Sequence, residues 1–323
     1  MPLVMDRLRS VRARALPSLV DAVGRTPLLR LRGIEAHEDL GAAIELYAKL
    51  EFFNPGGSVK DRAALAIVRE LLASGRLKGG ARLLDSTSGN TGVAYAWIGA
   101  ALGVPVTLVM PENVSSPRKR IAEAYGVEII YSDPLEGSDG AIRLARALAE
   151  KEPSRYAYVD QYSNACNPQA HFDGTGAEIW AATQGRVTHF VAGIGTSGTL
   201  MGTGRRLKHE SSKVRVIGVQ PSDSFHGLEG LKHLATSLVP PIFKASAVDE
   251  MRFIETDLGW DLAERLAHEE GALVGHSAGA ALAGALAVAQ ELRERGESGV
   301  VVTVFPDKAE RYLETGPAPK GTP

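Results

Sequence analysis

Cysteine is almost absent from this chain of 323 residues, and Cys166 is the only one. A single thiol cannot form an internal disulfide, and it cannot supply the clustered ligands of a cysteine-rich zinc or iron–sulfur site. The eight histidines show no pairing at the spacing of metal ligands. The sequence therefore predicts no metal site, and the lack of disulfides favours a reducing cytoplasm as the location.

Long apolar runs and a strong net charge are also missing. No stretch is long enough to cross a membrane, and the first residues lack the apolar core of a signal peptide. The net charge of -2 gives no reason to expect nucleic acid or an anionic membrane as a partner, so small molecules are the expected ligands. The first fifteen residues are basic because they contain four arginines, Arg7, Arg9, Arg12 and Arg14. This segment is interpreted either as an organelle-targeting segment or as a solvated arm.

Apolar segments of strand length alternate with helical patterns along most of the chain. Strands are expected within 23–31 and at 44–51, 82–85, 104–110, 127–131, 156–160, 189–192, 214–219, 253–255, 273–274 and 300–305. This alternation predicts an α/β protein whose mainly parallel sheets carry helices on both faces. Ligands of such folds bind beyond the carboxyl ends of the strands.

The segment 54–62 reads Asn-Pro-Gly-Gly-Ser-Val-Lys-Asp-Arg, a glycine-rich loop that enters an amphipathic helix. Ser58 and Asp61 fit a capping box, which places Lys60 in the first helical turn. Because the amino end of a helix is electropositive, we expect the Lys60 amine to be neutral and nucleophilic more readily than a solvated lysine. Considered alone, the segment favours a solvated lysine beside Asp61 and Arg62, and only the other motifs reverse that preference.

Two further loops have the composition of binding sites. The loop 86–92 is rich in hydroxyl side chains and follows a predicted strand, while 193–199 reads Gly-Ile-Gly-Thr-Ser-Gly-Thr between a strand and a helix. Free amides and hydroxyls at a helix start are suited to a phosphate. The same glycines match the dinucleotide fingerprint, with Glu210 as a candidate ribose partner, and a plain strand-to-helix turn is the third interpretation.

Residues 275–279 match the Gly-x-Ser-x-Gly pattern of α/β-hydrolases around Ser277. In that fold the catalytic histidine follows the nucleophile, and no histidine follows His276 in this chain. The order of residues therefore argues against a hydrolase, and Ser277 is interpreted as a helix cap.

Three motifs taken together, at 54–62, 87–92 and 193–199, resemble the cysteine synthase family, which are fold type II enzymes that use pyridoxal 5'-phosphate. The resemblance covers nearly the whole chain. The segments 161–164, 174–180 and 231–243 look closest to the B-type cysteine synthases and the O-phosphoserine sulfhydrylases. It implies β-replacement on O-acetylserine or O-phosphoserine by sulfide or a related thiol, through an aminoacrylate intermediate, to make L-cysteine.

The resemblance also implies roles for individual residues. Lys60 would bind the cofactor covalently and act as general base, and Asn90 and Ser277 would contact its ring. The cofactor phosphate would be held by Gly195, Thr196, Ser197, Gly198 and Thr199. The substrate would be held by Thr87, Ser88, Gly89, Thr91, Gln161, Gly230 and Lys232, the last of these toward a substrate phosphate or an anionic sulfur donor.

One position departs from the family pattern. Many members place a serine or threonine at the pyridine nitrogen, and here Lys308 is interpreted as occupying that position, beside Asp307. An ammonium would oppose protonation of the ring, whereas Asp307 turned inward would favour it, so the partner of the nitrogen stays unassigned.

Three alternative functions stay open. The first is a cystathionine β-synthase type reaction, although the chain leaves no room for a regulatory tandem and has no cysteine near its amino terminus to bind haem. The second is an NAD-dependent oxidoreductase, which would leave Lys60 and Asn90 unexplained. The third is a non-catalytic protein that binds pyridoxal phosphate.

We therefore predict two lobes, each with a mainly parallel sheet flanked by helices. The smaller lobe spans 54–164, the larger lobe spans 15–53 and 165–316, and 1–14 and 317–323 are expected to be flexible ends. The expected partners are an amino-acid substrate, a sulfur donor and, by the resemblance, a second copy of the chain in a homodimer.

Overall fold

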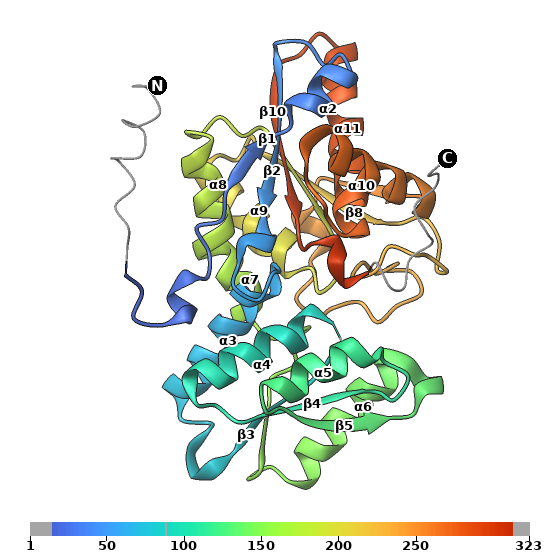
Figure 1. Ribbon diagram of the computed structural model, residues 1–323. Helices are drawn as coiled ribbons and strands as arrows, with labels where there is room; N and C mark the ends of the chain where they lie inside the picture. The colour runs from blue at the N-terminus through green and yellow to red at the C-terminus, as the bar shows by residue number, and fades with distance from the viewer. Residues whose placement is uncertain (1–14, 88, 313–323) are drawn as a thin grey trace, which may run out of the picture.

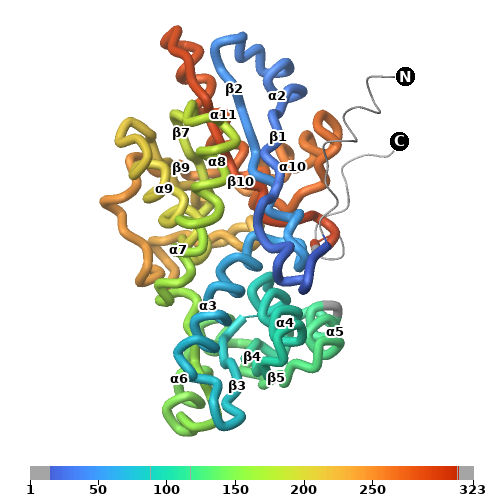
Figure 2. The backbone as a smooth tube through the Cα atoms, turned by 90° about the vertical axis from the view of Figure 1, so that its left-hand side faces the viewer, coloured from blue at the N-terminus to red at the C-terminus, as the bar shows by residue number. Residues whose placement is uncertain are grey.

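The computed structural model describes residues 15–87 and 89–312, which form two bodies, each built on its own sheet (Figure 1). Both predicted flexible ends and Ser88 lie outside the described residues. Figure 2, turned by a quarter, shows that α3 (Lys60–Ser74) and α7 (Cys166–Ala170) lie where the two bodies meet. The two sheets fall on opposite sides of the predicted division of the chain, and the exact bounds of the lobes stay a prediction.

The larger body contains a six-stranded sheet in the order β1-β2-β10-β7-β8-β9. Only the β1–β2 pair is antiparallel, and the other neighbours run parallel. Its strands are β1 (Leu28–Arg30), β2 (Ile44–Leu50), β7 (His189–Gly193), β8 (Arg215–Pro221), β9 (Glu250–Ile254) and β10 (Gly299–Phe305). The central strand β10 is buried along its whole length, as expected for a parallel strand covered on both faces.

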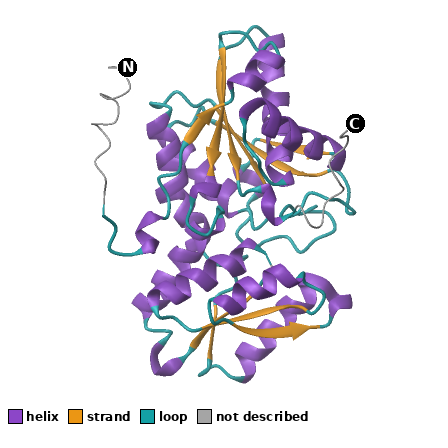
Figure 3. Ribbon diagram, viewed as in Figure 1, coloured by secondary structure: helices purple, strands orange, loops and turns teal. Residues whose placement is uncertain are grey.

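Helices cover both faces of this sheet (Figure 3). One face packs against α2 (Arg32–His37), α10 (Thr256–Glu270) and α11 (His276–Glu294), and the other against α8 (Ala177–Ala182) and α9 (Gly198–Glu210). Successive residues of β10 divide between the two cores, with Val301 on the first face and Val302 on the second. Successive side chains of a strand point to opposite faces of the sheet, so these two valines enter different cores.

The smaller body contains a four-stranded parallel sheet in the order β5-β4-β3-β6. Its strands are β3 (Arg82–Ser86), β4 (Val106–Pro111), β5 (Glu128–Ser132) and β6 (Tyr156–Tyr158). Its helices are α3, α4 (Asn90–Leu102), α5 (Ser116–Ala124) and α6 (Gly137–Lys151). Leu83 packs toward α3 and α4, while Leu84 packs toward α6, so this sheet is also covered on both faces. The predicted α/β class is confirmed.

Two local predictions were wrong. Residues 273–274 do not form a strand, because only an isolated bridge joins Val274 to Lys308. The capping box is not formed either, since Val59 is the N-cap of α3. Asp61 instead accepts the Gly56 N–H at 2.5 Å and the Trp97 indole N–H at 3.1 Å, so its carboxylate fastens the loop to α4.

No helix of residues 15–87 and 89–312 combines the length and the hydropathy needed to cross a bilayer.

A buried cluster of charges fixes the start of α3. Arg62 donates from Nε to Glu51 Oε2 at 2.6 Å and from Nη2 to Glu178 Oε2 at 2.7 Å, and Lys49 Nζ also lies 2.7 Å from Glu178. Glu51 is fully buried. Burial alone would raise the pKa of Glu51, but the charge of Arg62 and its hydrogen bonds outweigh burial and lower it. The cluster ties the helix that carries Lys60 to the sheet of the larger body.

Replacing Arg62 with alanine is expected to destabilise the protein strongly. The substitution leaves the Glu51 carboxylate buried without its main cationic partner, which typically costs about 3–5 kcal/mol. The midpoint of thermal unfolding should therefore fall by roughly 6–15 °C, measured by circular dichroism. Arg69→Ala is the matched control, because the Arg69 side chain is 59% exposed and its ion pair with Asp21 spans 3.9 Å. Equal midpoints for the two variants would contradict the structural role of Arg62.

Candidate functional site

A cavity of about 470 Å³ receives side chains from both bodies. An adjoining cavity of about 50 Å³ shares several lining residues with it, among them Lys60, Asn90 and Thr196. Residues predicted from the sequence that line the larger cavity are Lys60, Thr87, Gly89, Asn90, Thr91, Gln161, Gly195, Thr196, Gly230 and Lys232. Ser197, Thr199 and Ser277 line the smaller one. Segments that are far apart in the sequence therefore line the same two adjoining cavities.

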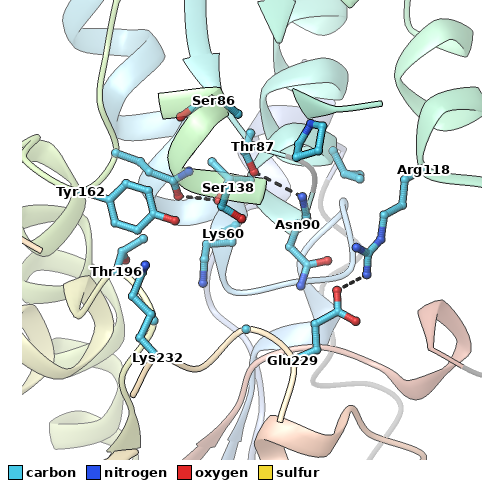
Figure 4. A pocket seen from close by; sticks show the side chains of 18 of the residues that line it. Lys60, Ser86, Thr87, Asn90, Arg118, Ser138, Tyr162, Thr196, Glu229 and Lys232 are labelled. Atoms are coloured by element: carbon cyan, nitrogen blue, oxygen red, sulfur yellow. Dashed lines mark hydrogen bonds and ion pairs between the residues drawn. The ribbon is translucent and has the colours of Figure 1, made fainter. Parts of the chain in front are cut away.

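Lys60 is the first residue of α3 and extends into the cavity between Asn90 and Thr196 (Figure 4). The preceding loop is held against the end of β10, because the Val59 N–H donates to the carbonyl of Pro306 at 2.8 Å. The pKa of the Lys60 amine is lowered, as predicted. The cause is burial, which the charge of Asp307 partly opposes. A lysine in this setting is neutral more readily than one in water.

The glycine-rich loop follows β7 and enters α9, which begins at Gly198. A Cβ atom at Gly195 would lie 2.4 Å from the carbonyl oxygen of Gly230, and one at Gly198 would lie 1.9 Å from Asn167 Oδ1. A side chain at either position would therefore clash with these atoms, so the loop conformation requires glycine at both. Ser197 has a φ of 68° and is 2% exposed, and its hydroxyl has no hydrogen-bond partner among the described residues. A buried donor without a partner at a helix start indicates a site for an anion.

Two buried residues support this loop, and the sequence analysis missed both. Asn167 Nδ2 donates to the carbonyl of Gln161 at 2.9 Å and to Thr196 Oγ1 at 3.1 Å. His171 contacts Thr199 Oγ1 through Nε2 at 3.4 Å. Burial lowers the pKa of His171 to about 3, with the charge of Arg62 adding to the effect, so the imidazole is neutral. Neither residue belongs to a motif, and only the folded chain brings them to the loop.

The hydroxyl-rich loop forms the opposite wall of the cavity. Thr91 Oγ1 donates to Gln161 Oε1 at 2.7 Å, which joins this loop to the segment after β6. Asn90 Nδ2 donates to Asp307 Oδ2 at 2.5 Å. Hydroxyls, amides and the first free N–H groups of α4 together form a site that suits a carboxylate without using a cation.

The end of β10 resolves which of two neighbouring residues faces the cavity. Asp307 is 1% exposed, lines the smaller cavity and accepts hydrogen bonds from Asn90 and from the hydroxyl of Tyr312. The Lys308 side chain is 46% exposed and lies 3.7 Å from Glu310. Of the two residues between which the sequence left the choice open, Asp307 is therefore the inward one, and Lys308 faces solvent. Tyr312 is a further lining residue that the motifs did not indicate.

Three further charged side chains border the cavity, with Arg118 and Glu229 on one side of Lys60 and Lys232 on the other (Figure 4). Arg118 of α5 forms an ion pair with Glu229 of the larger body, and both line the cavity. Lys232 is half-buried, and its Nζ lies 5.2 Å from the centre of the Tyr162 ring. The pKa of Lys232 is lowered by burial, against the opposing charge of Asp139. Arg118 and Glu229 had no signal in the sequence, since their pairing depends on how the two bodies meet.

Two sequence interpretations do not fit the structure. Glu210 ends α9 and pairs with Arg206 at 2.7 Å, at the far end of the helix from the glycine-rich loop, so it cannot bind a ribose next to that loop. Ser277 is not the cap of α11, because Gly275 occupies the N-cap position. The Ser277 side chain contributes instead to the wall of the smaller cavity.

Comparison with known proteins agrees with this geometry. Residues 19–307 match the family model described as "Pyridoxal-phosphate dependent enzyme". The chain is 52% identical to a cysteine synthase of Aquifex aeolicus over 94% of this chain and 92% of that protein. It is 40% identical to cysteine synthase B of Escherichia coli over 93% and 96% of the two chains.

Among solved structures, the O-acetylserine sulfhydrylase isoform 3 of Entamoeba histolytica superposes with a TM-score of 0.90 at 34% identity. The superposition covers 97% of this chain and 95% of that one. Because the matched residues include both bodies and most of the residues that line the cavity, the chain belongs to the family of pyridoxal-phosphate dependent enzymes.

Proposed function

We propose that this protein is a cysteine synthase that replaces the β-substituent of an activated L-serine with sulfide or a related thiol. The observation that carries the proposal is a pair of adjoining cavities in which the Lys60 amine lies between a glycine-rich loop at a helix start and a set of neutral hydroxyl and amide donors. The high identity with a cysteine synthase over nearly the whole chain supports it. An NAD-dependent oxidoreductase is disfavoured, since Glu210 lies away from the cavity.

The cavity fits pyridoxal phosphate. The glycines let the loop lie against Gly230 and Asn167 without a clash, and the buried Ser197 hydroxyl, without a hydrogen-bond partner among the described residues, is available to a phosphate. We assign the phosphate to the residues Gly195, Thr196, Ser197, Gly198 and Thr199. We assign Lys60 as the residue that bonds covalently to the cofactor, with Asn90 and Ser277 beside its ring. When bound, the cofactor supplies an electron sink for the charge that develops at the substrate Cα.

The protein's own groups then perform the remaining tasks. Lys60, whose lowered pKa makes the neutral amine accessible, removes the proton from the substrate Cα and later returns it. Thr87, Gly89, Thr91 and Gln161 hold the substrate carboxylate, and we place Ser88 in the same group. Gly230 borders the space for the rest of the substrate. Walls from both bodies keep bulk water from the reacting carbon.

Lys232 is assigned to an anionic group of one of the two substrates. It lines the cavity, no ion pair involves it in the described part of the chain, and burial makes an unpaired ammonium costly there. A phosphate on the donor or a thiosulfate as sulfur donor would satisfy this charge. Asp307, which is the inward residue at the end of β10, is assigned to the cofactor side of the cavity.

We further propose a cytoplasmic homodimer with no nucleic-acid or membrane partner. The resemblance to cysteine synthases supports the dimer, and the single cysteine fits a reducing compartment.

Lys60→Ala is expected to abolish the covalent attachment of the cofactor and to lower kcat by roughly a thousand-fold or more, since it removes the attachment point and the base together. Absorbance spectroscopy of the purified protein should show a visible band in the wild type that is lost or shifted in the variant. Lys78→Ala, at an exposed lysine of the smaller body, should keep both band and activity. A visible band and turnover unchanged in Lys60→Ala would refute the assignment.

Lys232→Ala is expected to weaken use of the anionic substrate selectively. A hydrogen bond to a charged group is worth about 1.5–3 kcal/mol, so kcat/KM should fall roughly ten- to a hundred-fold for that substrate. Steady-state kinetics with O-phosphoserine and sulfide, and separately with O-acetylserine and thiosulfate, show which substrate carries the anion. Lys244→Ala, at an exposed lysine, serves as control. An equal loss with O-acetylserine and sulfide would show that Lys232 does not recognise an anion.

A further inference from the structure

Asp85 is a buried acid that the proposed reaction does not use. It lies near the carboxyl end of β3, directly before the hydroxyl-rich loop, and is 1% exposed. Its Oδ1 accepts the Ser86 N–H at 2.9 Å, while its Oδ2 has no hydrogen-bond partner among the described residues. In the same part of the chain, no ion pair involves Asp85, whereas neighbouring Asp160 is paired with Arg146 at 3.1 Å.

The groups that face Asp85 come from α4, from β6 and from the segment after β6. From β6, Tyr158 has a raised pKa, mainly through burial and next through the charge of Asp85. From α4, Tyr95 is fully buried, and its hydroxyl lies near the Asp85 carboxylate but outside hydrogen-bonding geometry. After β6, the Gln161 N–H points to Asp85 and the Asp160 carboxylate lies nearby. Burial raises the pKa of Asp85 to about 7, opposed by the Ser86 and Gln161 N–H groups and the Tyr95 hydroxyl. The charge of Asp85 therefore changes near neutral pH.

The position of Asp85 links it to the cavity. Both peptide N–H groups that face it belong to lining residues, Ser86 and Gln161. Tyr162 also lines the cavity, and its pKa is raised to about 12 by burial and, next, by the charge of Asp85. A ligand carboxylate among Thr87, Thr91 and Gln161 would bring a second negative charge into the same poorly hydrated surroundings. Two like charges in such a site disfavour each other's ionised form.

We propose that Asp85 takes up a proton when the carboxylate of the amino-acid substrate docks on the neighbouring loop. The proton comes from solvent and binds Asp85 Oδ2, and the Tyr95 hydroxyl accepts the hydrogen bond of the new O–H. The coupling is reciprocal, so the carboxylate binds more tightly when Asp85 is neutral, that is, at lower pH. This inference rests on the proposed function, which assigns the substrate carboxylate to this loop.

The test uses the holoenzyme and propionate, a carboxylate without an amino group that could react with the cofactor. Titration calorimetry in two buffers of different ionisation enthalpy at pH 7 gives the number of protons taken up per site. For the wild type we expect uptake of a fraction of a proton, and an affinity that falls roughly five-fold or more from pH 6 to pH 8. Asp85→Asn should take up no proton and should bind propionate at pH 8 with the affinity that the wild type shows at pH 6.

Two further variants test whether the proton uptake belongs to Asp85. Asp257→Asn, at an exposed acid of α10, should keep the uptake of the wild type. Tyr95→Phe removes a group that lowers the pKa of Asp85, so the pH of maximal uptake should move upward, which tests the coupling even if Asp85→Asn fails to fold. Propionate binding without proton uptake in the wild type, or uptake that persists in Asp85→Asn, overturns this inference alone. Failure of propionate to bind overturns the carboxylate site as well.

Discussion

The buried Arg62 guanidinium, held between Glu51 and Glu178, is the interaction on which the rest of the structure depends. Arg62 lies two residues after Lys60, so the same ion pairs that join the two bodies also hold the first turn of α3, from which Lys60 extends. A buried charge without partners is costly, and this cost restricts the loop before α3 to a narrow set of positions. The ion pairs of Arg62 therefore both stabilise the fold and position the start of the helix that carries Lys60.

Parallel sheets place the other parts of the site. The carboxyl ends of parallel strands lie at one edge of a sheet, so the loops that follow these strands gather at that edge and line the site there. β3 delivers the hydroxyl-rich loop, β7 delivers the glycine-rich loop, and β10 delivers Asp307. Because each body supplies its own edge, the cavity lies where the bodies meet and is completed by both. Asn167 joins the glycine-rich loop at Thr196 to Gln161, and Thr91 of the hydroxyl-rich loop donates to the same Gln161.

Burial sets the charges of the groups at this junction more than sequence neighbours do. The same loss of hydration lowers the pKa of Lys60 and of His171 and raises that of Asp85. The first effect provides a reactive amine and the second a neutral support for Thr199. The third raises the pKa of an acid next to the loop to which we assign the substrate carboxylate. The sequence predicted a lowered pKa for Lys60 from its position at a helix start. The direction is correct, but burial is the main cause.

The sequence by itself determined the α/β class, the order of nearly all strands and the three motifs, because hydrophobic period, glycine placement and hydroxyl content act over a few neighbouring residues. It did not determine that Asp307 faces inward while Lys308 faces solvent, since adjacent residues after a strand differ only in the direction that packing gives them. It also gave no sign of Asn167, His171 or the Arg118–Glu229 pair. The Arg118–Glu229 pair joins residues 111 positions apart and forms only where the two bodies meet. Asn167 and His171 reach the glycine-rich loop only through the packing of their segment against it, because no local pattern in the sequence encodes that packing.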